Sequence, residues 1–184
     1  MQDFFIQNTT PIVSFLTLVL NIVTVGLLFV LIFPKNKISQ KMLTNIGPYL
    51  LPASFLVAFG SVLGSLVYSE IIQFEPCLLC WWERIFIYPQ LVILAIGLYV
   101  KEKSVFLYSL VFALLTILVS GYHTYLQLAG SSSAFCATAV VSCSKVYFLT
   151  YGYITIPTMA LSVGLFFFVT SLLYKKSVNQ NKIC

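Results

Sequence analysis

Residues 75–84 read EPCLLCWWER, and an apolar run, IFIYPQLVILAIGLYV, follows directly at 85–100. The apolar run has 16 residues, fewer than the roughly 20 that a helix needs to cross a hydrocarbon core of about 30 Å. It reaches that length if the helix begins near Cys77, which places Cys77 and Cys80 in the first turn. Two thiols at a membrane edge can bind a metal, staple the chain or exchange electrons.

The composition is that of an integral membrane protein with an all-α fold. Of the 184 residues, 60% are hydrophobic and 8% are charged, whereas soluble domains carry about 25% charged residues. Backbone groups in lipid must be hydrogen-bonded within their own segment, so each long apolar stretch is expected to be a helix. Five stretches can span a bilayer: Ile12–Phe33, Ile46–Tyr68, Ile85–Val100 with its extension toward Cys77, Val105–Leu126 and Ile156–Tyr174. In the second, Gly60 and Gly64 form a small-xxx-small pattern, which predicts close packing against another helix.

The lysines orient these helices. Eight of the ten basic residues lie in alternate connections, within 34–45, within 101–103 and after Tyr174. By the positive-inside rule these connections are cytoplasmic, so the N-terminus and both cysteine-bearing loops face outward. The net charge of +5 reflects this asymmetry, and we expect membrane lipid around the chain and no nucleic-acid partner. The first helix is expected to be retained, because no Lys or Arg precedes it and no small-residue cleavage site follows.

The cysteine spacing favours redox chemistry over the other two uses. The five cysteines are Cys77, Cys80, Cys136, Cys143 and Cys184. The first four face outward, where disulfides persist in a bacterium, and Cys184 is expected to be a spare cytoplasmic thiol. The second pair is spaced Cys-x6-Cys, a poor match to a zinc ribbon, so no metal site is predicted. A structural disulfide three residues long constrains the unfolded chain little, whereas a helix start favours a reactive thiolate.

Two single-copy residues strengthen the redox interpretation. Arg84 is the only arginine and lies four residues after Cys80, on the same helical face, where a cation lowers a thiol pKa. The alternative is an interfacial arginine that reaches the headgroups. His123 is the only histidine and lies near the outer end of the fourth helix, with Gln127 one turn further. Ionisable residues within membrane helices usually mark a functional path, although His123 could instead bond to headgroups.

The second cysteine pair lies in a loop that begins with Gly and Ser residues and is rich in aromatics. This pattern predicts a mobile loop along the membrane surface, with a disulfide accessible to a soluble partner; a purely loop-stabilising disulfide is the alternative. Electrons could then pass from a soluble dithiol protein to Cys136 and Cys143, and on to Cys77 and Cys80. The sequence has no haem, flavin or nucleotide motif, so a quinone is the natural lipid-soluble acceptor.

Three motifs resemble the DsbB/BdbC family of bacterial membrane disulfide-bond-forming oxidoreductases. They are PCLLCWWER, then HTYLQL thirteen residues ahead of Cys136, and the ITIP that enters the last helix. The resemblance implies a four-helix redox core at 46–176, preceded by an extra transmembrane helix and linker at 1–45 and followed by a cytoplasmic tail at 177–184. It also implies the bacterial inner or plasma membrane, ubiquinone or menaquinone as cofactor, and a DsbA-like thioredoxin-fold thiol oxidase as partner.

The resemblance assigns roles residue by residue. The catalytic residues it implies are Cys77, Cys80, Cys136 and Cys143, and the quinone-binding residues are Arg84, His123 and Cys80. Cys80 would be the thiolate that faces the quinone, stabilised by Arg84, with His123 beside the quinone. Cys136 would form the mixed disulfide with the partner, Cys143 would resolve it, and Cys77 would be the sulfur attacked from the second pair. The extra N-terminal helix and the closer spacing of the second pair depart from the family pattern.

Two rival interpretations have distinct signatures. A vitamin K epoxide reductase-like enzyme also couples thiols to quinones, but its quinone-facing Cys-x-x-Cys lies in the last core helix, whereas here it begins the third of five. A non-enzymatic small membrane protein with structural disulfides predicts that Cys80→Ser lowers stability without affecting any electron transfer.

Overall fold

The helical membrane fold expected from the sequence is confirmed. The computed structural model describes residues 2–33, 36–100, 104–130, 136 and 141–180, so Cys184 and several of the connecting lysines lie outside the described residues. The elements are α1 (Gln2–Ile32), α2 (Lys37–Ile46), a 3-10 turn η1 (Gly47–Tyr49), α3 (Leu50–Leu66), a π-helical turn η2 (Val67–Ile71), α4 (Leu78–Val100), α5 (Val105–Ala129) and α6 (Ile156–Gln180). Five helical segments are long and apolar enough to cross a membrane: Ile6–Ile32, Ile38–Ile71, Leu78–Val100, Val105–Ala129 and Ile156–Ser177.

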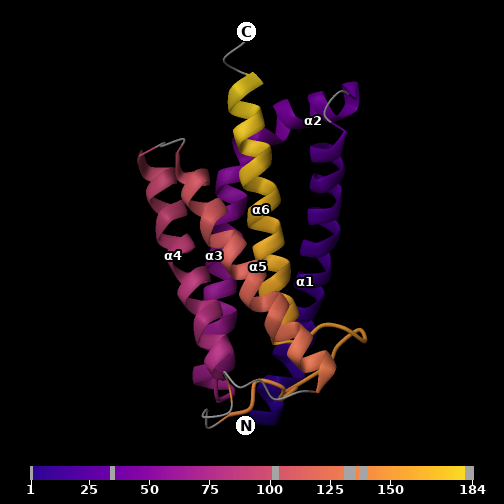
Figure 1. The fold of residues 1–184 in the computed structure, drawn as a ribbon, viewed down its shortest axis with the longest axis vertical. Coiled ribbons are helices and arrows are strands. Elements are labelled where there is room, and N and C mark those ends of the chain that lie inside the picture. Colours follow the sequence, from indigo (N-terminus) through magenta and orange to yellow (C-terminus); the bar gives the residue numbers. More distant parts are fainter. Residues whose placement is uncertain (1, 34–35, 101–103, 131–135, 137–140, 181–184) are drawn as a thin grey trace.

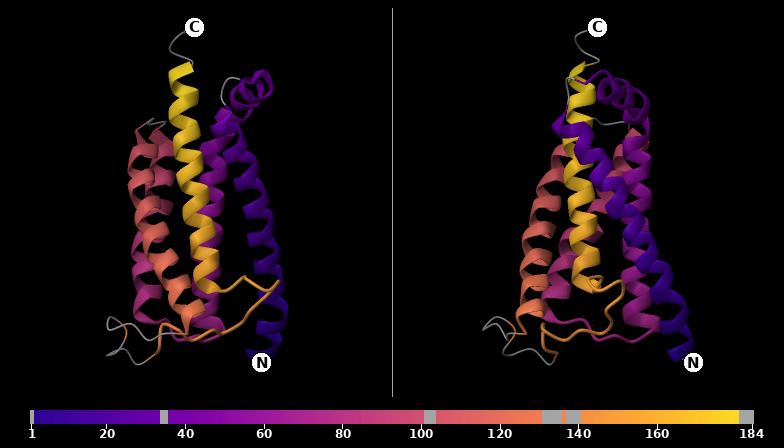
Figure 2. Two further views of the ribbon diagram at one scale, coloured as in Figure 1. Left: turned by 45° about the vertical axis from the view of Figure 1, so that its right-hand side comes forward. Right: turned by 90° about the vertical axis from the view of Figure 1, so that its right-hand side faces the viewer.

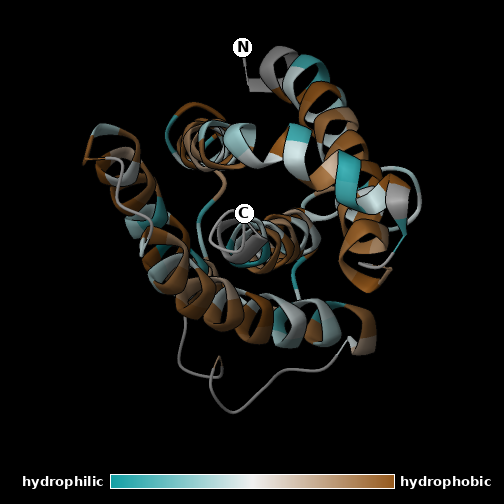
Figure 3. Ribbon diagram, turned by 90° about the horizontal axis from the view of Figure 1, so that it is seen from above, coloured by the Kyte–Doolittle hydropathy of each residue, from teal (hydrophilic) through white to brown (hydrophobic). Residues whose placement is uncertain are grey.

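Helix α6 is the centre of the bundle. Seen from above, the other helices surround it (Figure 3), and many of their large apolar side chains are exposed. Helix α6 contacts α1, α3, α4 and α5, and it buries Phe166, Phe167 and Leu173. The two helices α5 and α6 approach closely at Gly164, where an added Cβ would meet the Ile117 backbone nitrogen at 3.3 Å. Such close approaches give van der Waals contact, the main attraction between helices in lipid.

Polar contacts fix neighbouring helices to each other inside the bundle. The Ser109 hydroxyl of α5 donates to Gln90 Oε1 of α4 at 2.8 Å. Ser54 of α3 hydrogen-bonds Thr170 of α6 at 3.4 Å. Interhelical hydrogen bonds of this kind contribute about 0.6–2 kcal/mol each in membrane proteins, so they set helix register more than they set total stability.

The N-terminal region adds two helices to one side of the bundle. Helix α1 lies against α6. Lys176 Nζ donates to the Leu31 carbonyl at 3.1 Å, in the last turn of α1, where carbonyls lack a partner within the helix. The segment after it, expected only as a connection, forms α2 across the end of the bundle (Figures 1 and 2). Asn36 caps α2 by accepting from Ile38 N at 3.2 Å.

The two ends of the bundle carry different chemistry. The start of α1, the turn before α4 and residues 141–155 ahead of α6 lie at one end, whereas α2 and the C-terminal end of α6 lie at the other (Figure 1). Helix α4 begins at Leu78 and has 23 residues, which confirms that the cysteine motif supplies the length missing from the apolar run. Both thiols therefore lie at the first end of the bundle.

Candidate active site

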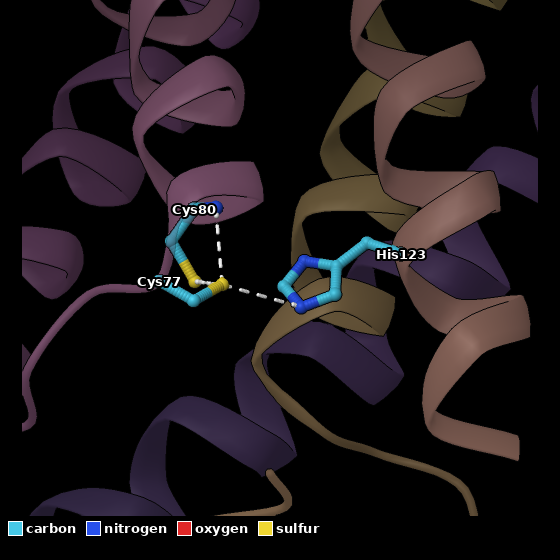
Figure 4. A group of neighbouring side chains, drawn as sticks. All are labelled: Cys77, Cys80 and His123. Atoms are coloured by element: carbon cyan, nitrogen blue, oxygen red, sulfur yellow. Dashed lines mark hydrogen bonds between the residues drawn. The ribbon is translucent and has the colours of Figure 1, made fainter. Parts of the chain in front are cut away.

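The first cysteine pair forms the start of α4. The Cys77 carbonyl accepts from Trp81 N at 3.2 Å, and the Cys77 sulfur accepts from Cys80 N at 3.4 Å, so Cys77 caps the helix. The two residues are thiols here, with their sulfurs 3.1 Å apart (Figure 4). Cys77 is buried and Cys80 is half-buried. The two sulfurs are therefore close enough to form a disulfide with little movement, and the two cysteines lie in different surroundings.

The negative charge of the reduced pair belongs on Cys77. A hydrogen bond from the Cys80 thiol is the largest effect, and His123 and the Cys80 backbone N–H act in the same direction against the cost of burial. Together they lower the pKa of Cys77 to about 4. Cys77 precedes the membrane-spanning part of α4. A thiolate is the nucleophile in thiol–disulfide exchange, so Cys77 is prepared for that reaction.

A buried Glu83–His123 pair contacts Cys77 through the histidine ring. His123 Nδ1 lies 2.9 Å from Glu83 Oε1, and the two side chains are 2% and 5% exposed. His123 Nε2 lies 3.6 Å from the Cys77 sulfur and 3.1 Å from the Cys143 carbonyl oxygen. Because Nε2 must donate to that carbonyl, Nδ1 either donates to a carboxylate or accepts from a carboxylic acid. In both forms the pair is neutral and contains a transferable proton.

Glu83 is a candidate site residue that the sequence does not single out. It lies in the buried stripe of α4 with Leu79 and Ile87, four residues to either side. That spacing places three residues on one helical face. The available signal was a carboxylate within an otherwise apolar stripe, which in a membrane helix requires a partner. The one histidine of the chain supplies it.

The second cysteine pair forms the expected disulfide, but in a different environment. Cys136 and Cys143 are bonded to each other and are 6% and 2% exposed. They share a buried cluster with Cys77, Leu79 and Leu126, against which Cys80 also packs. The sequence predicted an accessible disulfide, and the structure buries it.

Hydrogen bonds to the helix ends explain this burial. Gln127 Nε2 donates to the Lys145 carbonyl at 3.0 Å, and the Tyr147 hydroxyl donates to the Glu75 carbonyl at 2.7 Å. His123 holds the Cys143 carbonyl in the same way. Gln127 therefore fastens the loop. Both cysteines of the disulfide are therefore buried in this arrangement.

Arg84 lies on the opposite side of the motif from His123. Its Nη2 donates to the Ser65 carbonyl of α3 at 3.4 Å, and its guanidinium lies 5.3 Å from the centroid of the Trp81 ring. The Tyr88 hydroxyl donates to Ser65 Oγ at 3.2 Å. Within the described residues, no carboxylate forms a salt bridge with Arg84. Its charge is thus available to another negative group.

A cavity of about 640 Å³ opens beside Cys80 and Arg84, in the range of about 300–1,000 Å³ typical of ligand pockets. Helices α1, α3, α4 and α6 supply its walls, which are mostly apolar. Of the residues expected to bind a cofactor, Cys80 and Arg84 line this cavity, whereas His123 is not among its lining residues. An apolar space with a thiol and a cation at one end fits a flat, lipid-soluble molecule with carbonyl oxygens.

Three potential metal ligands also meet at this site. Sulfur and nitrogen atoms of Cys77, Cys80 and His123 all lie within 4.8 Å of one another (Figure 4). A structural zinc site has four ligands, and His123 is already hydrogen-bonded through both ring nitrogens. The same three groups serve thiol chemistry without an ion.

A helical membrane bundle in which two cysteine pairs share one buried cluster is a membrane thiol–disulfide protein. The family model "Disulfide bond formation protein DsbB" matches residues 49–174, and the chain belongs to this family, whose members are disulfide oxidoreductases. This assignment favours the DsbB/BdbC interpretation over the vitamin K epoxide reductase-like one.

Relatives from several bacilli match the same way. A probable disulfide formation protein C of Halalkalibacterium halodurans is 41% identical over 125 residues, 67% of this chain and 91% of the relative. The SPbeta prophage-derived disulfide bond formation protein B of Bacillus subtilis is 39% identical over 106 residues, 58% of this chain and 72% of the relative. A probable disulfide formation protein C 2 of Bacillus anthracis is 33% identical over 140 residues, 76% of this chain and 99% of the relative. No solved structure matches the chain.

Proposed function

We propose that the protein reoxidises a DsbA-like thioredoxin-fold thiol oxidase and passes the electrons through its two cysteine pairs to a membrane quinone, ubiquinone or menaquinone. The observation that carries the proposal is the position of the first pair. Cys77 shares a buried cluster with Cys136 and Cys143, whereas Cys80 lines the apolar cavity. Membership of the disulfide bond formation family supports the same assignment.

The first half of the cycle is thiol–disulfide exchange. One thiol of the reduced partner attacks Cys136 and forms a mixed disulfide, which releases Cys143 as a thiol. The second thiol of the partner then attacks the partner's own sulfur in that bond, so Cys136 is released as a thiol and the partner leaves oxidised. The two new thiols then reduce a Cys77–Cys80 disulfide by attack on Cys77, which regenerates the Cys136–Cys143 bond. Each transfer moves two electrons and is favourable when the acceptor has the higher potential, with about 30 mV equivalent to about 1.4 kcal/mol.

The second half returns Cys77 and Cys80 to a disulfide. A bound quinone supplies an acceptor of two electrons and two protons. Two thiols become one S–S bond, so the protein must release two electrons and two protons in total. The Cys77 thiolate lies 3.1 Å from the Cys80 sulfur and is placed to form that bond. Glu83 and His123 hold a proton next to Cys77, and Arg84 stabilises negative charge in the cavity.

We also propose the cellular arrangement. The protein lies in the bacterial cell membrane with its N-terminus and both cysteine pairs outside and its C-terminus in the cytoplasm. Lys41 of α2 and Lys175 of α6 lie at the end of the bundle opposite the cysteines, which agrees with the positive-inside rule. Residues 46–176 form the redox core, 1–45 an added helix and linker, and 177–184 a tail.

The test is a reconstituted electron-transfer assay. Purified protein receives a reduced thioredoxin-fold dithiol protein and a quinone, and quinone reduction is followed by absorbance. Cys→Ser changes at the four site cysteines are each expected to abolish turnover, and Cys184→Ser is the matched control that keeps it. Turnover that survives loss of any one of the four cysteines would falsify the relay. If Cys80→Ser lowers only stability, and the unchanged protein reduces no quinone, the disulfides are structural.

A further inference from the structure

The added helix α1 forms one wall of the cavity that begins at Cys80. Seven of its residues line this space, from Val13 to Leu27. At about 1.5 Å per residue the lined part of α1 is about 21 Å long, most of a hydrocarbon core of about 30 Å. Figure 2 shows α1 running along the side of the bundle, with α6 beside it. The cavity therefore extends from the cysteine end deep into the membrane.

The opposite wall is α3, where two glycines widen the cavity. The sequence predicted that Gly60 and Gly64 allow close helix packing, and this prediction is wrong. A Cβ added to either glycine meets nothing within 4 Å, although both residues line the cavity. The physical reason is that α1 leans on α6 and leaves space in front of α3. The glycines remove side chains from a space that apolar residues would otherwise fill.

The polarity of the cavity changes along its length. Its cysteine end holds the Arg84 guanidinium, the Cys80 thiol and the Tyr88 side chain, whereas its far end is formed by groups such as Leu27, Leu50 and Phe166. A ligand that fits has a polar head and a long apolar chain. A prenylquinone has that shape, and its ring belongs at the thiol that reduces it.

We infer that α1 forms the binding wall for the prenyl tail of the quinone, so that this chain holds the tail inside the protein. The inference rests on the proposed function, because it takes the ring to lie at Cys80 and Arg84. Residues 2–32 of α1 lie outside the family match at 49–174, so this wall is an addition to the redox core. Its expected effect is tighter binding of long-tailed quinones, without a direct effect on a ring that lacks a tail.

Photolabelling tests the position of the tail without any turnover. A quinone with an alkyl chain ending in a diazirine is irradiated with the full-length protein, and labelled peptides are mapped by mass spectrometry. The label is expected on the cavity face of α1 and on α3, and an excess of unlabelled long-tailed quinone should displace it. Label confined to the outer faces of α4 and α5 overturns the inference. So does label on α1 that only a phospholipid competitor displaces, because the cavity then holds an acyl chain.

Matched substitutions test the cavity directly. Gly60→Leu and Leu20→Trp fill it, whereas Gly26→Leu and Ile22→Trp make the same changes on the exposed side of α1, since Gly26 and Ile22 are exposed and absent from the lining. A side chain that fills the cavity takes up space that the tail would occupy, so the cavity variants should bind a long-tailed quinone about tenfold more weakly. Binding is measured by quenching of tryptophan fluorescence and by the quinone retained on purification.

The outcomes separate the inference from the proposed function. Both cavity variants should bind a tailless quinone within about twofold of the unchanged protein, and both outer-face controls should match the unchanged protein with either quinone. Equal affinity of cavity and control variants for the long-tailed quinone overturns the inference alone. If the unchanged protein neither binds nor reduces any quinone, the proposed function has failed first.

Discussion

Cys77 and Cys80 are three residues apart, yet they belong to different parts of the molecule. Cys77 is buried among polar and redox groups, with His123 3.6 Å from its sulfur and the second cysteine pair in the same cluster. Cys80 borders an apolar cavity whose nearest cation is Arg84. The first turn of α4 therefore joins a protein-facing environment to a lipid-facing one. A short Cys-x-x-Cys can connect these environments because a helical turn moves the second sulfur around the helix axis.

The largest expected effect comes from replacing either thiol of the first pair. The two variants should differ in the disulfide-linked product that accumulates. Cys77→Ser and Cys80→Ser should each reduce turnover by at least about a thousandfold, because each removes a reacting atom. In Cys80→Ser, however, Cys77 remains able to attack the second pair and should accumulate a disulfide with Cys136 or Cys143. Cys77→Ser should accumulate none. Peptide mapping under non-reducing conditions measures the cross-link, and equal cross-linking in both variants contradicts the assigned environments.

Changing Glu83, which forms the buried pair with His123, should affect the reactions of Cys77 more than those of Cys80. Glu83→Ala leaves His123 buried without its partner and should lower turnover about a hundredfold, the usual range for a lost proton-transfer group. Glu83→Gln keeps a hydrogen-bonding group at the same place and should recover part of the loss. The measurement is the pH profile of turnover. A merely structural Glu83 would lower the amount of folded protein and leave the profile of the remainder unchanged.

Arg84 tests the cavity side. Arg84→Met removes the cation beside Cys80 and should raise the apparent KM for quinone about tenfold, the size of one charged hydrogen bond. Oxidation of the partner by preformed disulfides should stay within about twofold, since the contacts of Arg84 among the described residues are with Ser65 and Trp81 and not with the second cysteine pair. Arg84→Lys serves as the charge-preserving control. Equal losses in both half-reactions would identify a structural arginine instead.

The sequence predicted one side of this comparison better than the other. The five spanning helices, the start of α4 at the cysteine motif and the pairing of Cys136 with Cys143 followed from hydropathy, length and spacing. Glu83 and His123 lie on different helices and are 40 residues apart in sequence, so no local sequence pattern predicts their contact.

Packing between helices also explains the two other errors. The open space at Gly60 and Gly64 depends on where α1 rests, and the burial of Cys143 depends on hydrogen bonds from helix ends to its loop. The sequence correctly indicates small residues at Gly60 and Gly64 and a loop around Cys143. What surrounds the glycines and the loop depends on how the helices pack in three dimensions, and a local sequence pattern does not specify that packing.

The smallest expected effect concerns the charge on Cys77. An ordinary cysteine with a pKa of about 8.5 reacts with an alkylating reagent about tenfold more slowly for each pH unit below that value. The pKa of Cys77 is lowered to about 4, chiefly by the hydrogen bond from Cys80, so its thiolate persists as the pH falls and is lost only near that value. Between about pH 8 and about pH 6 its alkylation rate should therefore change less than about twofold.

The partner thiol provides the contrast for that measurement. Cys80→Ala removes the main hydrogen bond that lowers the pKa of Cys77, so the alkylation rate of Cys77 should regain a dependence on pH in this variant. Peptide mapping after timed exposure to iodoacetamide gives the alkylation rate of Cys77 in the unchanged protein and in the Cys80→Ala variant. A pH-independent rate in Cys80→Ala would assign the lowered pKa to His123 and the helix start alone. A steep dependence in the unchanged protein would mean that Cys77 is a neutral thiol, and the polar surroundings of Cys77 would then not prepare it for attack.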